Sequence, residues 1–400
     1  MSILEKAMAY VRRKAEEFLP KLRELSPSQV VVVHHDDADG LCAGAVASKA
    51  LENLGLAPSR VCLEKMIPEA VEKIHSMEGG LIVYCDIGSP HGDMIAKLNH
   101  GRNLVVILDH HDPTPGDDPL VIDVNLEYAG FRGEEEFSGA TCAYLFAKAL
   151  SRENIELAPL ALVGSMEIPA GFKGINAEVL EEALKEGFVE SRGKKLFIKS
   201  LGVHVEELFS KLQVLGPVGY YSGGPELGVM SCLEGVSEEF WRRVEELEAR
   251  RKEANRKLLA MLYRGRLKQE KYIQWFDSGD VYKGMGTKVV GTFCSFLSYQ
   301  RRLVKPDKYI MGFMEMPRLI PGLGELPKEY TKVSVRVPRE LQRMVDEGGR
   351  PTAVKLLEEG CRGFGLADGH AYAASAILER SRELELVRKA DGFVEEFKEA

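Results

Sequence analysis

Short apolar runs alternate with helical patterns through the first third of the chain, and this alternation is the feature that most limits its fold. Five runs rich in Val and Ile are too short to be helices: residues 29–34, 61–66, 81–87, 104–108 and 120–124. Helical patterns, such as those at 43–54 and 69–75, separate most of them. Strands about 20 residues apart with helices between them form βαβ units, so we predict a parallel sheet whose strands are buried.

Helical and strand-like patterns also organise the rest of the chain. We predict an amphipathic helix at 2–25, a helical block from 139 to 186, and the longest helix at 236–264 with Ser237 as its N-cap. Strand-like runs follow at 272–276, 288–290, 309–314 and 332–337, then a helix near 351–359 and a glycine-bearing turn before 371–380.

These patterns predict an α/β protein in three parts. A catalytic domain with a parallel sheet occupies 1–235, a long basic linker helix occupies 236–268, and a smaller α/β domain occupies 269–400. A length of 400 residues is more than a single hydrophobic core usually supports, which also favours more than one domain.

Charge is distributed unevenly along the chain. The protein carries 53 Lys and Arg against 61 Asp and Glu, a formal charge of −8, which excludes a histone-like basic protein. Residues 1–190 hold 17 basic and 31 acidic side chains (net −14), whereas 191–400 hold 36 and 30 (net +6). Seven scattered cysteines without a C-x-x-C pair favour neither a disulfide framework nor a thiolate zinc site. No run of about 18 apolar residues is present, so we expect a cytoplasmic protein.

Acidic residues and histidines follow three of the predicted strands. They are the segment 34–40 (HHDDADG) after the first strand, Asp86 after the third, and Asp109-His110-His111-Asp112 after the fourth. Taken alone, each has a structural explanation as a solvated loop, a turn or capping aspartate, or a satisfied histidine. We expect Ser89 and Pro90 to be the N-cap and first residue of the next helix. Because chemistry in parallel sheets gathers beyond the carboxyl ends of strands, the three together favour a metal site suited to Mn²⁺ or Mg²⁺.

These motifs resemble motifs I, II and III of the DHH phosphoesterases, which include RecJ-type exonucleases, oligoribonucleases, exopolyphosphatases and manganese-dependent pyrophosphatases. The form His35-x-Asp37-Ala-Asp39-Gly40 is most similar to archaeal RecJ-like nucleases. Residues 137–144 resemble the family's S-G-A stretch at the start of a helix. Residues 332–336 and 369–374 resemble the S-x-R and G-G-G-H elements of the DHH-associated C-terminal domain.

The resemblance implies a site for two Mn²⁺ ions, with Mg²⁺ as the other candidate. One ion would lie on His35, Asp37 and Asp86, and the other on Asp39, Asp86 and His110. Such ions lie about 3.5–4 Å apart, generate a hydroxide at neutral pH and stabilise both the attacking and the leaving oxygen. This chemistry would let the protein hydrolyse phosphodiester bonds.

The resemblance also implies residues that act on the substrate. His111 would contact the scissile phosphate. The residues themselves predict that Asp109 holds the other ring nitrogen of the histidine that ligates the metal. Ser138, Arg336, Gly369 and His370 would contact the nucleic acid. Without the family pattern, Arg336 would be interpreted as a surface arginine and His370 as a residue at the start of a helix.

Three positions depart from the family pattern or are not explained by it. The fourth-motif aspartate is missing, and Glu167, one position early, or a water would replace it as a metal ligand. The G-G-G-H element contains Asp368, an acidic residue where backbone usually approaches phosphate. His34 is either a support for His35 or a buried strand end.

The longest predicted helix has a basic second half. Between Arg242 and Lys268 we count ten basic and four acidic residues. This is either a solvated helix with spaced ion pairs or a surface that follows phosphates by counterion release. We predict the second, with Arg250 and Arg251 among the contacts. Candidates for base stacking are Trp241, Tyr263, Trp275 and Phe276, for each of which ordinary packing is the alternative.

The sequence therefore predicts a metal-dependent phosphodiesterase, a RecJ-like exonuclease that degrades single-stranded DNA or RNA from an end. One alternative is an oligoribonuclease or nucleoside-bisphosphate phosphatase of the same family. The other is a replication or repair scaffold with weakened catalysis. Family analogy suggests a helicase or replisome protein as a partner, and no membrane association is expected.

Overall fold

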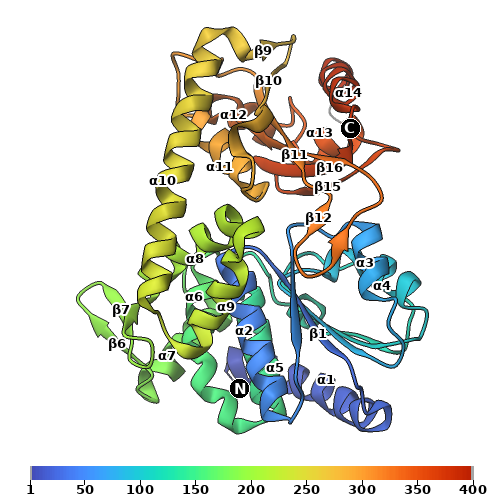
Figure 1. The fold of residues 1–400 in the computed structure, drawn as a ribbon, viewed down its shortest axis with the longest axis vertical. Coiled ribbons are helices and arrows are strands. Elements are labelled where there is room, and N and C mark those ends of the chain that lie inside the picture. Colours follow the sequence, from blue (N-terminus) through green and yellow to red (C-terminus); the bar gives the residue numbers. More distant parts are fainter. Residues whose placement is uncertain (1, 398–400) are drawn as a thin grey trace. The chain divides into compact units, whose positions relative to one another are not determined.

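The computed structural model describes residues 2–397, which form two compact units (Figure 1). The first comprises Met1–Glu245 with Ile320–Gly324, and the second comprises Glu246–Leu319 with Glu325–Ala400. The change from one unit to the other falls within the long helix α10 (Glu238–Met261). Among the described residues, no helix is both long and apolar enough to span a bilayer.

The first unit contains the predicted parallel sheet, in the order β2-β1-β3-β4-β5. Its strands are β1 (Val30–His35), β2 (Ser59–Leu63), β3 (Leu81–Cys85), β4 (Leu104–Leu108) and β5 (Val121–Asp123). All four pairings are parallel, and His34 aligns with Cys85, which aligns with Leu108. The carboxyl ends of the three central strands are therefore level with one another, and the prediction of an α/β protein with a parallel sheet is confirmed.

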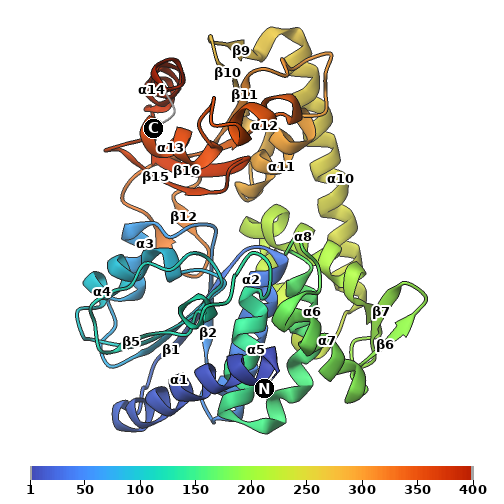
Figure 2. The same cartoon turned by 180° about the vertical axis from the view of Figure 1, so that it is seen from behind.

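Helices surround this sheet and form the rest of its core. They are α1 (Ile3–Leu25), α2 (Ala38–Asn53), α3 (Pro68–Ile74), α4 (Gly92–Asn99), α5 (Gly139–Leu150), α6 (Ala158–Ser165) and α7 (Gly174–Lys185). Helix α2 lies beside α5 in both views and also packs against α6 (Figures 1 and 2). Its small side chains are buried on nearly every side, which lets the two neighbours approach closely.

Three further elements complete the first unit. A small antiparallel sheet consists of β6 (Val189–Arg192), β7 (Lys195–Ile198) and β8 (Val203–His204). It is followed by α8 (Val205–Gly219) and α9 (Gly224–Glu234). The strands are only two to four residues long, too short for a hydrophobic period to predict them.

The second unit is built on a six-stranded sheet in the order β15-β16-β14-β11-β10-β9. Its strands are β9 (Lys268–Gln269), β10 (Ile273–Asp277), β11 (Tyr309–Met316), β14 (Tyr330–Arg336), β15 (Gly365–Gly369) and β16 (Ala373–Glu379). Only β10 and β11 pair in parallel. A two-stranded hairpin, β12 (Leu319–Ile320) with β13 (Gly324–Glu325), lies between β11 and β14 in the chain.

Helices cover both faces of this second sheet. Met311, Phe313 and Val333 on one face share a hydrophobic core with α12 (Arg339–Asp346), α13 (Ala353–Gly360) and α14 (Glu383–Glu396). Neighbouring strand residues point to the opposite face, where Gly312 and Ser334 lie against α11 (Lys288–Leu297). The smaller α/β fold of this unit agrees with the prediction.

The structure corrects three local predictions. Residues 288–290 are the first turn of α11 and not a strand, because Val289 and Val290 belong to a buried helical face that continues to Leu297. His370 lies in the turn between β15 and β16, so it does not start a helix. Ser89 begins a short 3₁₀ turn and caps no helix; its hydroxyl donates to Asp123 Oδ1 at 3.1 Å.

Candidate metal centre

The carboxyl ends of β1, β3 and β4 bring the predicted ligands together. His35 ends β1, Asp37 caps α2, Asp86 follows β3, and His110 lies just beyond β4. Their nitrogen and oxygen atoms form two groups, each with all candidate ligand atoms within 4.8 Å of one another. The first group is His35, Asp37 and Asp86; the second is Asp86, Asp109, His110 and His111. Asp86 belongs to both, as a bridging ligand must.

Asp86 has an unusual backbone conformation. Its φ is +59°, in the left-handed region, which aspartate adopts more readily than most residues other than glycine. Its backbone N–H donates to the carbonyl of Leu108 at 2.8 Å, so the neighbouring strand holds it there. Such a conformation costs about 1 kcal/mol or more and is found preferentially at functional sites.

The first group is organised around the ring of His35. Its Nδ1 lies 2.8 Å from Asp37 Oδ2 and 3.6 Å from Asp86 Oδ2. Its Nε2 lies 3.3 Å from Oδ1 of Asp36, a buried carboxylate that the sequence reasoning did not single out. The other oxygen of Asp37 accepts a hydrogen bond from the backbone of Gly40 at 3.0 Å. The ring of His35 therefore lies between two carboxylates, with Nδ1 toward the shared Asp86.

The second group contains a histidine with a fixed tautomer. His110 Nδ1 lies 3.0 Å from the carbonyl of Gly133, so this nitrogen is the donor. Nε2 then presents a lone pair 3.4 Å from Asp86 Oδ1 and 3.9 Å from Asp39 Oδ2. Burial, followed by the nearby charge of His111, lowers the pKa of His110, which favours the neutral ring that a metal requires.

Asp39 is held by the N-terminus of α5. Its carboxylate accepts hydrogen bonds from Ser138 Oγ (2.9 Å) and from the backbone of Gly139 and Ala140 (both 2.8 Å). The positive end of the helix dipole stabilises the negative charge. Ser138 is fully buried, so its side chain supports Asp39 and is not exposed to a nucleic acid, contrary to the sequence prediction.

Asp109 forms a pair with His111 at the edge of the site and does not hold the ring of the metal-ligating His110 as predicted, because the carbonyl of Gly133 occupies that position. Asp109 Oδ1 lies 2.7 Å from His111 Nδ1, and Oδ2 accepts from the backbone of Ser89 at 2.9 Å. Burial alone would raise the pKa of Asp109, but the charge and hydrogen bond of His111 outweigh it and lower that pKa overall. The His111 side chain is 40% exposed, so a substrate can reach a ring that Asp109 orients.

The unsatisfied atoms at the centre fit bound cations. Asp86 Oδ1 and His35 Nδ1 are buried and have no partner in hydrogen-bond geometry among the described residues. Burial, and then the nearby carboxylates of Asp39 and Asp37, raise the pKa of Asp86 well above its usual range. A divalent cation removes both penalties, and this mixture of carboxylate oxygens and imidazole nitrogens suits Mn²⁺.

Glycines let the backbone approach these ligands, and sequence reasoning missed this role. A Cβ atom on Gly139 would lie 2.4 Å from Asp86 Oδ1, and one on Gly164 would lie 2.2 Å from Asp39 Oδ1. At Gly133 it would lie 1.7 Å from the carbonyl oxygen of His110. No one-dimensional pattern distinguishes these glycines from turn glycines, because the atoms they approach are distant in sequence.

The structure places two further residues of the first unit whose roles the sequence left open. Glu167 lies just beyond α6 and belongs to neither metal group; its carboxylate accepts a hydrogen bond from Gln213 of α8. A role as metal ligand therefore stays a prediction. His34 is a buried strand end, with Nδ1 2.8 Å from the carbonyl of His35 and a pKa lowered to about 4 by burial.

The second unit carries the predicted phosphate contacts at one end of its sheet. Arg336 ends β14, and its Nε donates to Ser295 Oγ of α11 at 2.8 Å. His370 is exposed in the turn that follows Gly369, whose φ is +132°. Asp368, the departure from the family pattern, accepts a hydrogen bond from Ser375 at 3.0 Å, so its carboxylate is held by the adjacent strand.

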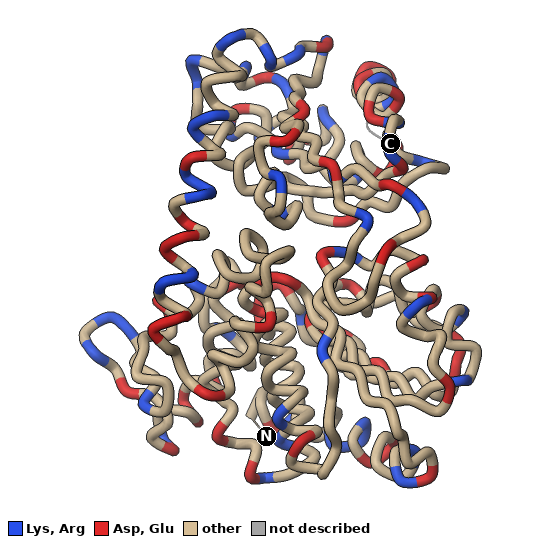
Figure 3. Tube along the Cα trace, viewed as in Figure 1, with Lys and Arg blue, Asp and Glu red and all other residues tan. Residues whose placement is uncertain are grey.

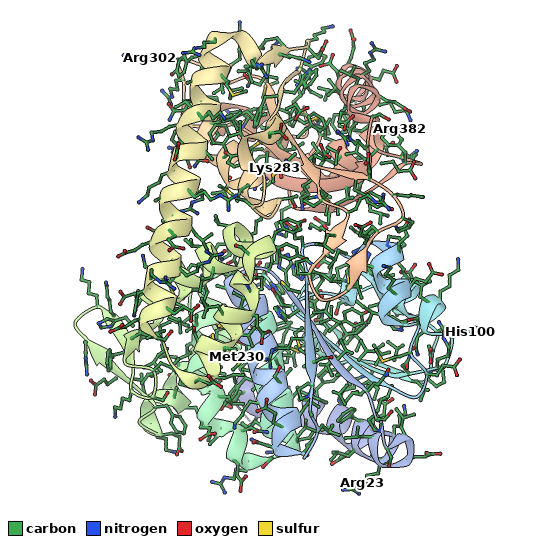
Figure 4. All side chains as sticks on the ribbon, viewed as in Figure 1. Arg23, His100, Met230, Lys283, Arg302 and Arg382 are labelled. Atoms are coloured by element: carbon green, nitrogen blue, oxygen red, sulfur yellow. The ribbon has the colours of Figure 1, made fainter. Side chains whose placement is uncertain are left out.

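Other predicted binding residues have different surroundings. Arg250 donates to the carbonyl of Lys283 at 2.5 Å and so attaches α10 to a turn of the same unit; Arg251 lies next to it on α10. Trp275 and Phe276 are core residues, unsuited to stacking on bases. Phe296 and Tyr299, which the sequence reasoning did not select, are 43% and 78% exposed beside Ser295. Arg302 is also exposed on this unit (Figure 4).

Comparison with known proteins agrees with this geometry. The sequence model of the DHH family, N-terminal domain, matches residues 29–165, which contain all three ligand-bearing strand ends. An uncharacterised protein of Methanocaldococcus jannaschii is 26% identical over 166 residues, 40% of this chain and 38% of the relative. The chain therefore spans well under half of that relative.

Two solved structures share the fold. RecJ of Thermus thermophilus in complex with Mn²⁺ has a TM-score of 0.65 at 19% identity, over 98% of this chain and 55% of that RecJ chain. A second exonuclease RecJ, bound to manganese, has a TM-score of 0.62 at 19% identity, over 97% of this chain and 95% of that chain. This chain thus spans about half the length of Thermus RecJ.

The ligand cluster thus lies within the segment that the family model matches. Residues 29–165 match the N-terminal domain of the DHH family, and the chain as a whole has a RecJ-like fold.

Proposed function

We propose that the protein is an exonuclease that hydrolyses single-stranded nucleic acid from an end. The observation that carries this proposal is the convergence of His35, Asp37, Asp86 and His110, with the buried Asp86 Oδ1 left without a hydrogen bond. The fold shared with two RecJ proteins, both solved with manganese, supports the same reaction class.

Two divalent ions would be held by His35, Asp37 and Asp86 on one side and by Asp86, His110 and Asp39 on the other. When bound, they would supply a nucleophile at neutral pH and neutralise charge on the reacting phosphate. The chain contributes preorganisation: Asp36 lies beside the outer nitrogen of His35, and Gly133 accepts from that of His110. Ligands held in this way need little rearrangement when metal and substrate arrive.

His111 is the residue that meets the substrate in this proposal. Its Nδ1 is tied to Asp109, so the opposite nitrogen is directed away from that carboxylate and, in the protonated ring, donates to a phosphate oxygen. The partial exposure of the ring, compared with the burial of Asp109, is consistent with contact to a ligand that comes from solvent.

In this proposal the second unit binds the nucleic acid strand. Arg336 keeps Nη2 without a hydrogen bond to any residue within 2–397, whereas Nε and Nη1 are anchored to Ser295 and Val335. An arginine fixed at one edge offers its other edge to a phosphate. Phe296, on the helix that holds it, and Tyr299, just beyond the end of that helix, would stack on bases.

The alternative function is that of an oligoribonuclease or nucleoside-bisphosphate phosphatase. Asp368 favours it, because an acidic side chain beside His370 weakens the hold on a long polyanion. A replication or repair scaffold is less well supported, since a chain without catalysis has no need for a converged set of buried ligands. A helicase or replisome partner is a further part of the proposal that rests on family analogy alone.

A manganese-dependent assay on strands labelled at either end, as DNA and as RNA, tests the proposal. We expect hydrolysis that begins at one end, stops when EDTA is added, and proceeds faster on 20-mers than on dinucleotides. Fastest turnover on dinucleotides would favour the oligoribonuclease. No hydrolysis of any strand, together with no manganese binding, would favour the scaffold.

A further inference from the structure

The small sheet β6-β7-β8 carries an exposed basic hairpin. Between residues 190 and 199 the basic side chains are Arg192, Lys194, Lys195 and Lys199, all exposed, and the only acidic one is Glu190. Figure 3 shows this concentration of Lys and Arg at the tip of β6 and β7. The matched DHH segment ends at residue 165, so the hairpin lies outside that segment.

The hairpin has a defined shape. Arg192 pairs with Lys195 across a two-residue turn, and Gly193 takes a φ of +66° at its first position, which suits a tight hairpin. Val189, Ile198 and Val203 are buried beneath it. The backbone of Leu196 donates to Glu206 of α8 at 3.3 Å, which attaches the sheet to the unit.

The charges at the tip oppose the stability of the hairpin. Arg192 and Lys195 are directly opposite in register, and like charges in that position destabilise a strand pair. Arg192 is stabilised by Glu190 at 2.6 Å and by the ring of Phe197, 3.3 Å below it. Within residues 2–397, Lys194 and Lys195 form no ion pair. A hairpin with only a structural role would place an opposite charge at one of these positions.

The surrounding unit makes this patch distinctive. Residues 1–190 carry a net charge of −14, which repels a polyanion, whereas the hairpin presents four cations and one anion in ten residues. Lysine ammonium groups are point charges on flexible side chains, so they recognise charge without shape. This chemistry fits the repeating phosphates of a nucleic acid backbone and provides no contact for reading bases.

We propose that the β6–β7 hairpin binds the phosphate backbone of the nucleic acid at a distance from the end being hydrolysed. This inference rests on the proposed function, because the substrate is what brings a nucleic acid to the first unit. The contact is independent of sequence and acts only on substrates long enough to reach the tip. Lys194 and Lys195 provide affinity, and the metal centre provides the chemistry.

The test replaces both tip lysines, Lys194→Gln with Lys195→Gln, in the full-length protein. Affinity for a fluorescein-labelled single-stranded nucleic acid of 30 nucleotides is measured in EDTA between 50 and 300 mM salt. Loss of two phosphate contacts should lower the slope of log affinity against log salt by about 1.4, since each contact to a single strand contributes about 0.7. Hydrolysis of a dinucleotide with manganese should be unchanged.

A matched control separates contact from net charge. Lys6 and Lys97 are exposed on the same unit, and Lys6→Gln with Lys97→Gln makes the same change in charge. The control should keep the slope of the unaltered protein within about 0.3. Equal slopes for the two double variants would overturn the proposal. If the unaltered protein hydrolyses nothing, the proposed function fails, but the comparison of slopes still decides the role of the hairpin.

Discussion

The two units differ in how their predicted functional residues are buried and held. In the first, the candidate ligands gather at the ends of parallel strands, and Asp37, Asp39 and His110 are held by hydrogen bonds to backbone groups. In the second, Arg336 is anchored along one edge only and His370 lies exposed in a turn. Bond cleavage needs atoms held to within a few tenths of an ångström, whereas a grip on a flexible strand tolerates movement. This difference agrees with the proposed division of roles, in which the chemistry belongs to the metal centre of the first unit, while Arg336 in the second unit and the β6–β7 hairpin of the first provide affinity.

Removal of the shared ligand should produce the largest effect. Asp86→Asn keeps a residue that tolerates the left-handed backbone but removes the charge that both ions would share. We expect manganese-dependent hydrolysis to fall by at least about 10³-fold and heats of manganese binding to disappear in calorimetry. In EDTA the melting temperature should not fall, because a buried negative charge has been removed. Activity close to that of the unaltered protein would disprove the metal assignment.

Replacement of the substrate-facing histidine should have the next largest effect. His111→Gln keeps a side chain that can donate but loses the bond that orients the ring on Asp109. We expect kcat to fall by about 10²–10³-fold while manganese binding, measured by calorimetry, is retained. If manganese binding disappears as well, His111 is a ligand, and the division between holding metal and meeting substrate must be redrawn.

A change in the second unit should alter binding and leave the chemistry intact. Arg336→Lys keeps the charge but loses the planar fork that is anchored on Ser295. We expect KM for a 20-residue strand to rise about tenfold, with kcat within about twofold of the unaltered protein. A fall in kcat with unchanged KM would mean that this arginine takes part in the reaction, against the proposed division of roles.

Acidification should affect the stability of the two units differently. It should have little effect on the activity measured at pH 7.5. Burial, the largest cause, lowers the pKa of His75 to about 4, while an unfolded histidine titrates near 6.5. Between pH 6.5 and 4 the unfolded chain binds more protons at this position, so the contribution of His75 to the stability of the metal-free first unit should fall as the pH falls, by roughly 2–3 kcal/mol. The described part of the second unit contains no buried histidine, so this contribution belongs to the first unit.

The two tryptophans make this measurement straightforward. Trp241 belongs to the first unit and the buried Trp275 to the second, so each single-tryptophan variant reports on one unit during urea unfolding in EDTA. A midpoint that moves with pH for Trp241 and remains fixed for Trp275 is the expected result. His75→Gln should reduce the movement. Equal movement of both midpoints would show that the units unfold together.

Sequence reasoning succeeded where chemistry follows directly from chain order. The strands of the first sheet could be predicted because buried parallel strands are continuous Val- and Ile-rich runs, and the ligands follow them at once. Asp37, Asp86 and His110 were found in this way, without any knowledge of which strands are neighbours.

It failed where a residue's role depends on what packs against it. Val289 and Val290 favour a strand locally, yet tertiary packing places them on a buried helical face. Ser138 was expected to contact nucleic acid, but its neighbour in space is Asp39, 99 positions away. In the sequence Arg250 is one cation of a basic run, but in the structure it donates a hydrogen bond to the carbonyl of Lys283 in a turn. The short strands of the basic hairpin gave no periodic signal at all.

The glycines around the metal centre have a consequence for how such a site should be searched by mutation. Truncating scans replace large side chains by alanine and pass over positions that have nothing to remove. At Gly139 and Gly164 a single added methyl group would occupy space already taken by the carboxylates of Asp86 and Asp39. The site is therefore sensitive to atoms added at its glycines. A scan that enlarges side chains would detect positions that a truncating scan cannot detect.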